Sequence, residues 1–96
     1  MVELRFEWGE RKNAANRRKH GVSFEEAQTV FYDDRALLID DPDEHEERFV
    51  LLGLSAMLRT LVVCHCYRAD DQVIRIISAR KARKDERADY ERRWKR

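Results

Sequence analysis

The sequence predicts a single α+β domain, in which two N-terminal helices pack on a three- to four-stranded antiparallel sheet and a further helix follows at the C-terminus. Three observations predict this class. The chain has 96 residues, enough for one modest core. Helical patterns come first and strand-like segments follow, so we expect the helices on one face of the sheet. The later strand-like segments are separated by short turns, as antiparallel strands are.

The N-terminal part predicts a strand and then a helix. Residues Val2–Trp8 alternate apolar and charged side chains, which is the period of a half-buried strand. Gly9 ends this alternation. The helix over Glu10–His20 is followed by Gly21, the residue preferred just beyond a helix C-terminus. One face of this helix is mostly polar, so only part of it is expected to pack on the core.

A capping pattern predicts where the second helix begins. Ser23 is followed three residues later by Glu26, and this spacing is the capping box. Because little chain separates the two helices, they should form a tight hairpin. The apolar stripe of the second helix consists of Phe24, Ala27, Val30 and Phe31.

The rest of the chain predicts strands and one more helix. A short strand is expected over Ala36–Asp40. The segments Arg48–Ser55, Thr60–Tyr67 and Val73–Ala79 are joined by short turns and should form a meander. A charged helix over Lys84–Trp94 follows.

The net charge of +1 hides an uneven distribution. Four successive parts of the chain carry net charges of +3, −9, +2 and +5, namely Met1–His20, Gly21–Glu47, Arg48–Ala79 and Arg80–Arg96. Two basic regions thus flank an acidic middle, and such a molecule can present a positive face to a polyanion.

The acidic segment Asp40–Glu47 contains His45 and the single proline, which raises the question of a metal site. We favour a solvated turn, because the carboxylates lack a ligand spacing and no glycine shapes a calcium loop. No metal or cofactor is expected. Cys64 and Cys66 lie two apart in one strand, so free, buried thiols are expected.

The N-terminus is charged from Glu3 onward and has no apolar signal region. No apolar run reaches the roughly 20 residues of a membrane span. We therefore expect a cytoplasmic protein.

The segment Val73–Ala82 combines an apolar strand with Arg75 in its middle and the pair Arg80 and Lys81 at its end. Cationic side chains on a buried strand suggest an anionic ligand. Strand alternation places Arg75 and Arg80 on opposite faces, provided that no bulge intervenes. A salt bridge for Arg75, or a plain basic flank for the pair, stays possible.

Several other side chains could take part in chemistry, although each has a structural alternative. His65 fits a core histidine, His20 fits a helix C-terminal residue, and Tyr90 and Trp94 fit helix packing. The cross-strand neighbour of Arg75, either Cys66 or Tyr67, depends on the register. The full set of candidates is Lys12, Lys19, His20, His65, Tyr67, Arg68, Arg75, Ser78, Arg80, Lys81, Glu86 and Tyr90.

Two stretches of the chain carry a resemblance to a known family. The first is Phe6-Glu7-Trp8, then Lys12, Asn16 and the run from Lys19 to Ala27, followed by Val30-Phe31. The second is Arg75 to Arg80, with Ala82, Glu86 and Tyr90. Both stretches resemble the BrnT toxin family. Gly9-Glu10 stands where the family commonly has Asp-Pro, and this departure affects only the start of the helix.

This resemblance implies a function and a fold. BrnT proteins are toxins of type II toxin–antitoxin systems with a compact, RelE-like ribonuclease fold. They cleave RNA, which stops translation and growth. Their partner is a BrnA antitoxin, which also binds the DNA of the operon.

The resemblance also implies metal-free attack of the ribose 2′-OH on the adjacent phosphate, for which a base, an acid and positive charge are needed. On this basis Arg75 and Arg80 are predicted to hold the phosphate. His20, Tyr67 and Glu86 are the predicted proton-transfer groups. The predicted RNA-binding residues are Lys12, Lys19, Arg68 and Lys81. Two other classes remain open: a binding module with a basic groove that does not cut RNA, and an oligomer formed through the charged helices.

Overall fold

The computed structural model describes residues 3–39 and 48–94, which form a five-stranded sheet with three helices. The strand order is β1-β5-β4-β3-β2. The predicted acidic turn with His45 lies outside the described residues. The strands are β1 (Arg5–Glu7), β2 (Leu37–Ile39), β3 (Phe49–Leu54), β4 (Thr60–Arg68) and β5 (Val73–Lys81); the helices are α1 (Glu10–His20), α2 (Phe24–Thr29) and α3 (Lys84–Trp94), with a 3-10 turn at Val30–Tyr32.

The α+β class is confirmed, but the predicted sheet of three to four antiparallel strands is wrong. Strands β2 to β5 are antiparallel neighbours as expected. The fifth strand is β1, which pairs with β5 in parallel, with Arg5 beside Val73 and Glu7 beside Arg75. The sheet is therefore mixed, because an edge strand from the start of the chain joins a strand from near its end.

Helix α1 has the predicted bounds, and its two buried side chains are asparagines, Asn13 and Asn16. The pairing of β1 with β5 ends at Arg75, and beyond this point the Asn16 side-chain amide forms hydrogen bonds with the edge of β5. It accepts a hydrogen bond from the Ala79 N–H (3.2 Å) and donates to the Ala79 C=O and the Val22 C=O (2.8 Å each). A side chain of α1 thus pairs with β5 in place of a strand.

The predicted cap of α2 is confirmed, because the Ser23 Oγ accepts a hydrogen bond from the Glu26 N–H at 3.0 Å. The Glu26 carboxylate is itself buried and bound by the Ser55 hydroxyl and the Arg59 guanidinium. The Arg59 hydrogen bond lowers the pKa of Glu26, despite the opposing effect of burial. This ion pair fastens α2 to the turn between β3 and β4.

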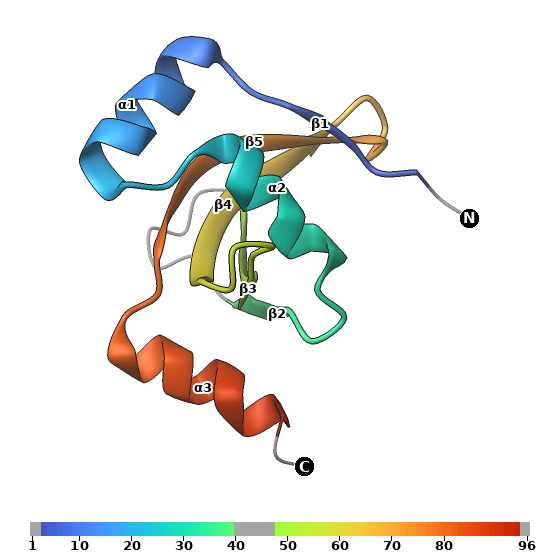
Figure 1. Cartoon of the computed structure of the whole chain (residues 1–96). Coiled ribbons are helices and arrows are strands. Elements are labelled where there is room, and N and C mark those ends of the chain that lie inside the picture. The colour runs from blue at the N-terminus through green and yellow to red at the C-terminus, as the bar shows by residue number, and fades with distance from the viewer. Residues whose placement is uncertain (1–2, 40–47, 95–96) are drawn as a thin grey trace.

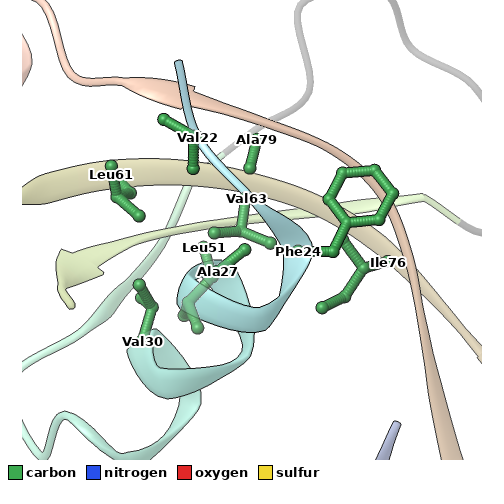
Figure 2. Close-up of a cluster of buried hydrophobic side chains, with 9 residues drawn as sticks. All are labelled: Val22, Phe24, Ala27, Val30, Leu51, Leu61, Val63, Ile76 and Ala79. Carbon is green, nitrogen blue, oxygen red and sulfur yellow. The ribbon is translucent and has the colours of Figure 1, made fainter. Parts of the chain in front are cut away.

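The core lies on both faces of the sheet, so the prediction of helices on one face is wrong. Figure 2 shows the larger cluster, in which α2 and the segment before it pack on β3, β4 and β5. On the other face, Tyr90 of α3 packs with Val50, Leu52, Val62 and Ala82. Adjacent apolar residues along β3 and β4 bury both faces, which is the reason for the third layer.

Helix α3 continues from the end of β5 and lies apart from α1 and α2 (Figure 1). Its Tyr90 hydroxyl donates to the Asp33 carboxylate at 2.6 Å, and the Leu54 N–H donates to the same oxygen at 2.8 Å. Burial raises the pKa of Asp33, but these hydrogen bonds outweigh it and the net shift is downward. Tyr90 therefore packs α3 against the sheet, which is the helix-packing role that the sequence suggested as the alternative to a chemical role.

His65 lies in the core, so it is the core histidine that the sequence suggested as the alternative to a chemical role. Its ring is fully buried, 4.7 Å from the Phe31 ring between centroids. Nδ1 lies 3.3 Å from the Val63 C=O, whereas Nε2 has no hydrogen-bond partner within the described part of the chain. Burial lowers the pKa of His65, because a charged imidazolium is poorly solvated there.

We expect this histidine to make the protein less stable in mild acid. Since its folded-state pKa lies below the unfolded value, the unfolded chain binds the proton first, and stability falls as the pH drops below about 6.5. The slope attributable to one group is on the order of 1 kcal/mol per pH unit. Urea unfolding from pH 7.5 to 5 measures it. His65→Phe, which keeps a ring against Phe31, should flatten the profile; an unchanged slope in this variant excludes His65 as the cause.

No helix in the described ranges is long and apolar enough to cross a membrane. Cys64 and Cys66 form no disulfide in the described part of the chain, and both are half-buried, whereas buried thiols were expected.

Candidate functional site

A β-bulge decides which residues of β5 share a face. Cys64 pairs with Ser78 and His65 pairs with Ile76, so Ile77 is an extra residue in β5. The extra residue changes which side chains of β5 share a face: Ser78 and Arg80 on one side of the bulge lie on the same face as Arg75 on the other side. Consequently Arg75 and Arg80, predicted to face opposite ways in an unbulged strand, point to the same face of the sheet. The open question of register is also answered, because Arg75 lies beside Cys66.

This shared face carries an open pocket of about 450 Å³ between the sheet, the end of α1 and the start of α3. Its floor comes from β4 and β5, where Cys64 and Ser78 are neighbours. Besides Cys64, the lining includes these residues with charged or ionisable side chains: His20, Arg48, Arg80, Arg83, Asp85, Glu86 and Asp89.

Arg80 and Glu86 form the central pair of the pocket. Nη1 and Nη2 of Arg80 donate to the two carboxylate oxygens of Glu86 at 2.8 and 2.9 Å. The side chain of Glu86 is only 9% exposed and that of Arg80 is 34% exposed. The buried carboxylate therefore holds a guanidinium that solvent can still reach. Such a planar, bidentate pair fixes both the position and the plane of the arginine.

The start of α3 holds Glu86 in place. The Arg83 N–H donates to its Oε1 at 2.8 Å, and the Arg83 side chain lies 3.3 Å from its Oε2. The hydrogen bond from Arg80 is the largest of the effects that lower the pKa of Glu86, and burial only partly opposes them. Glu86 is thus a carboxylate at neutral pH, which suits a residue that orients Arg80 better than it suits a general acid.

The charges in the pocket are balanced. Arg48, Arg80 and Arg83 bring three positive charges, and three carboxylates of α3 oppose them. Asp85 pairs with Arg83, and the third carboxylate, Asp89, pairs with Arg92 outside the pocket lining. Arg80 uses three of its five N–H groups, on Glu86 and on a backbone carbonyl, so others remain for an anion.

Of the predicted proton-transfer groups, His20 and Glu86 line the pocket but Tyr67 does not. His20 is half-buried at the end of α1. Tyr67 shares the opposite face of the sheet with His65 and Phe49, since the centroid of its ring lies 5.3 Å from that of Phe49 and 5.4 Å from that of His65. A single site therefore contains Arg80, Glu86 and His20 without Tyr67.

The predicted cationic residues are spread over the molecule. Arg75 and Arg68 lie on the pocket's face of the sheet or at its margin, where both bind Glu7. Lys81 lies past the bulge on the α2 face, beside Leu61. Lys12 and Lys19 are exposed on α1, and Lys19 immediately precedes His20.

Two arginines of the pocket, Arg48 and Arg83, were not among the predicted site residues. Arg83 could have been found, because it precedes α3 and Glu86 follows it by three residues, the spacing at which a side chain reaches back to a helix start. Arg48 carries no comparable sequence signal. Within residues 3–39 and 48–94, no group of three or more His, Cys, Asp or Glu side chains could hold a metal ion. The side chain of Trp94 lies outside the described residues.

Comparison with known proteins defines the class. The family described as the ribonuclease toxin BrnT of type II toxin–antitoxin systems matches residues 8–86. This range begins directly after β1 and contains α1, α2, β2 to β5, the start of α3 and every pocket-lining residue except Asp89. The chain therefore belongs to the BrnT family of ribonuclease toxins. No curated protein has a matching sequence.

A solved structure has the same fold. It is the crystal structure of the Brucella abortus ribonuclease toxin BrnT, with a TM-score of 0.67 and 20% sequence identity. The superposition covers 85% of this chain and 100% of the other. The arrangement of three helices around a mixed sheet is thus shared with a protein whose sequence has diverged widely.

Proposed function

We propose that this chain is an endoribonuclease that cleaves RNA without a metal ion and thereby stops translation and growth. The observation that supports this most strongly is the Arg80–Glu86 pair in the pocket, where a buried carboxylate presents a solvent-accessible guanidinium. Membership of a ribonuclease toxin family supports RNA as the substrate. The relation of this fold to RelE ribonucleases is part of the same proposal.

In the proposed reaction, the ribose 2′-OH attacks the adjacent phosphorus. The O2′–P bond forms, the P–O5′ bond breaks, and the proton of the 2′-OH leaves as another proton reaches the departing 5′-oxygen. The products are a 2′,3′-cyclic phosphate and a 5′-hydroxyl. The pentavalent transition state gains negative charge, so a fixed cation beside it lowers the barrier.

Arg80 supplies that cation. Because Glu86 holds it bidentately, its free N–H groups keep a fixed direction and need no reorganisation during the reaction. His20 is the proton-transfer group of the pocket, since imidazole both accepts and donates protons near neutral pH. Arg48 and Arg83 add positive charge along the path of the RNA.

The proposed partner is a BrnA-like antitoxin protein that covers this pocket, and DNA is bound only indirectly, through that antitoxin. The expected compartment is the cytoplasm, where RNA and antitoxin meet. Family membership supports the existence of an antitoxin.

The test is cleavage of a synthetic RNA by the purified protein in EDTA. We expect cleavage with a 2′,3′-cyclic phosphate end, and none at a position where a single 2′-deoxy nucleotide removes the attacking hydroxyl. Mass spectrometry of the fragments gives both results. Cleavage at the 2′-deoxy position, or products with a 5′-phosphate, contradicts the proposed reaction.

The same assay decides against the alternative of a binding module. Intact RNA at high protein concentration, combined with saturable binding, favours a basic groove that holds phosphates without cutting them. Loss of cleavage on addition of EDTA shows that a metal ion takes part.

A further inference from the structure

We propose that Arg75 and Arg68 form a second RNA phosphate subsite, separate from the cleavage pocket and reached by the same single strand. This inference rests on the proposed function, because it extends the substrate of the same face from one phosphate to several. Arg75 then binds a different phosphate from the one that Arg80 binds, whereas the sequence had predicted that both hold the reacting phosphate.

The two arginines are too far apart along the sheet to share one phosphate in their present positions. Arg75 pairs with Cys66 and Arg80 pairs with Val62, four residues away on β4. At about 3.3 Å per residue, their backbones lie about 13 Å apart. Arg80 is held by α3, beyond the end of β5, whereas Arg75 is held by Glu7 of β1, on the other side of β5 from β4.

The second cluster, which consists of Glu7, Arg68 and Arg75, carries a net positive charge. The Glu7 Oε2 accepts from Arg75 Nη1 at 2.9 Å and from Arg68 Nε at 3.2 Å. Two guanidiniums thus share one carboxylate, which leaves a net charge of +1. In the described part of the chain, these are the only hydrogen bonds or ion pairs of either guanidinium, so most of their N–H groups stay available.

The surface between the two clusters can accommodate a strand of RNA. On this face the residues between Arg75 and Arg80 are Cys66, Cys64 and Ser78, which are small, uncharged and half-buried. Cys64 and Ser78 also form the floor of the pocket. A shallow path with small side chains therefore connects two clusters that can each bind a phosphate.

A purely structural role for these residues is the competing explanation, since Glu7 and Arg75 also join β1 to β5. The two explanations differ in the effect of Glu7→Gln. This variant removes the shared carboxylate and frees both guanidiniums. A phosphate subsite then binds RNA more tightly, whereas a structural pair leaves affinity unchanged and lowers only the melting temperature.

The experiment measures binding of 2′-O-methyl oligonucleotides, which the proposed reaction cannot cleave, with two and with five nucleotides. Wild-type protein should bind the pentanucleotide more tightly. Arg75→Gln and Arg68→Gln should each weaken pentanucleotide binding roughly tenfold, about one charge-assisted hydrogen bond, and affect the dinucleotide less than twofold. The slope of log affinity against log salt should fall by about 0.7 for each lost contact. Arg18→Gln, an equal charge change on the exposed surface of α1, is the control.

Cleavage kinetics separate this proposal from the proposed function. With a long RNA, Arg75→Gln should raise KM roughly tenfold, as expected for a contact made equally in ground and transition states. If wild-type protein cuts no RNA, the proposed function fails, but the length dependence of binding still decides the subsite. Equal losses for both oligonucleotides in Arg75→Gln place Arg75 at the phosphate bound by Arg80 and overturn the proposal. Unchanged affinity in all three variants of the cluster overturns it in favour of the structural role.

Discussion

Replacing Arg80 with alanine is expected to lower the rate constant of RNA cleavage by about 10²–10³-fold, the effect of removing one fixed cationic donor from a transition state. Arg80→Lys should recover only a small part of the rate. An ammonium keeps the charge, but it cannot bind both oxygens of Glu86 and present further N–H groups in one plane. Single-turnover cleavage of a model RNA measures the effect on the chemical step.

Arg18→Ala is the matched control for Arg80→Ala, because it removes an equally charged side chain from the exposed surface of α1, outside the pocket lining. It should retain full activity. Circular dichroism and the melting temperature show whether Arg80→Ala is folded at the assay temperature. A folded Arg80→Ala protein with undiminished single-turnover rate contradicts the assignment of Arg80 to the reaction.

Glu86→Gln adds a readout that separates orientation from proton transfer. It keeps the shape of the side chain but loses the charge that fixes Arg80. If Glu86 acts through Arg80, the rate falls while its pH dependence between pH 6 and 8 keeps its shape. A group that transferred protons itself would, when removed, abolish one limb of the pH–rate profile.

Replacing Asn16 with alanine is expected to destabilise the protein by about 2–4 kcal/mol, a large effect for an asparagine on a helix. The change removes three hydrogen bonds and leaves the N–H and C=O of Ala79 and the C=O of Val22 without that partner. Each buried backbone group that loses its partner costs about 1–3 kcal/mol, less where water can enter. The melting temperature should fall by roughly 10–25 °C.

Arg11→Ala, on the exposed face of the same helix, is the control for Asn16→Ala and should change stability by less than about 0.5 kcal/mol. Asn16→Asp is a sharper comparison. It keeps an acceptor for the Ala79 N–H but loses both donors and introduces a charge at a buried position, so it should be at least as destabilising. Urea unfolding of the three variants measures these differences. If Asn16→Ala loses less than 1 kcal/mol, the edge of β5 does not depend on this side chain.

Local patterns in the sequence predicted most elements of the fold. The Ser23 cap, the Gly21 that ends α1 and the bounds of α1 and α3 follow from chemistry within a few residues, so they can be found without knowing the partners. The position of β1 could not be found in this way. Its pairing with β5 depends on contacts between residues 68 apart in the chain, as Glu7 and Arg75 are.

The pocket was predictable in part. Arg80, Glu86 and His20 were identified through the family resemblance, and all three line it. The side of the sheet on which Arg75 lies depends on the extra residue Ile77 in β5, and the sequence of an apolar strand does not reveal a bulge of this kind. A polar helix face likewise suggested solvent, whereas Asn16 uses its polarity to bind the backbone of β5.

The parallel pairing of β1 with β5 also has a consequence for how the chain folds. The first strand and α1 have their main sheet partner near the other end of the sequence, so a loop of roughly sixty residues must close before they can dock. Strands β3, β4 and β5 are hairpin neighbours and can associate earlier. During synthesis, α1 therefore has no sheet edge to bind until β5 has left the ribosome. The pocket between α1, β5 and α3 is complete only after β5 and α3 have both been synthesised, so a shorter nascent chain does not yet carry the site.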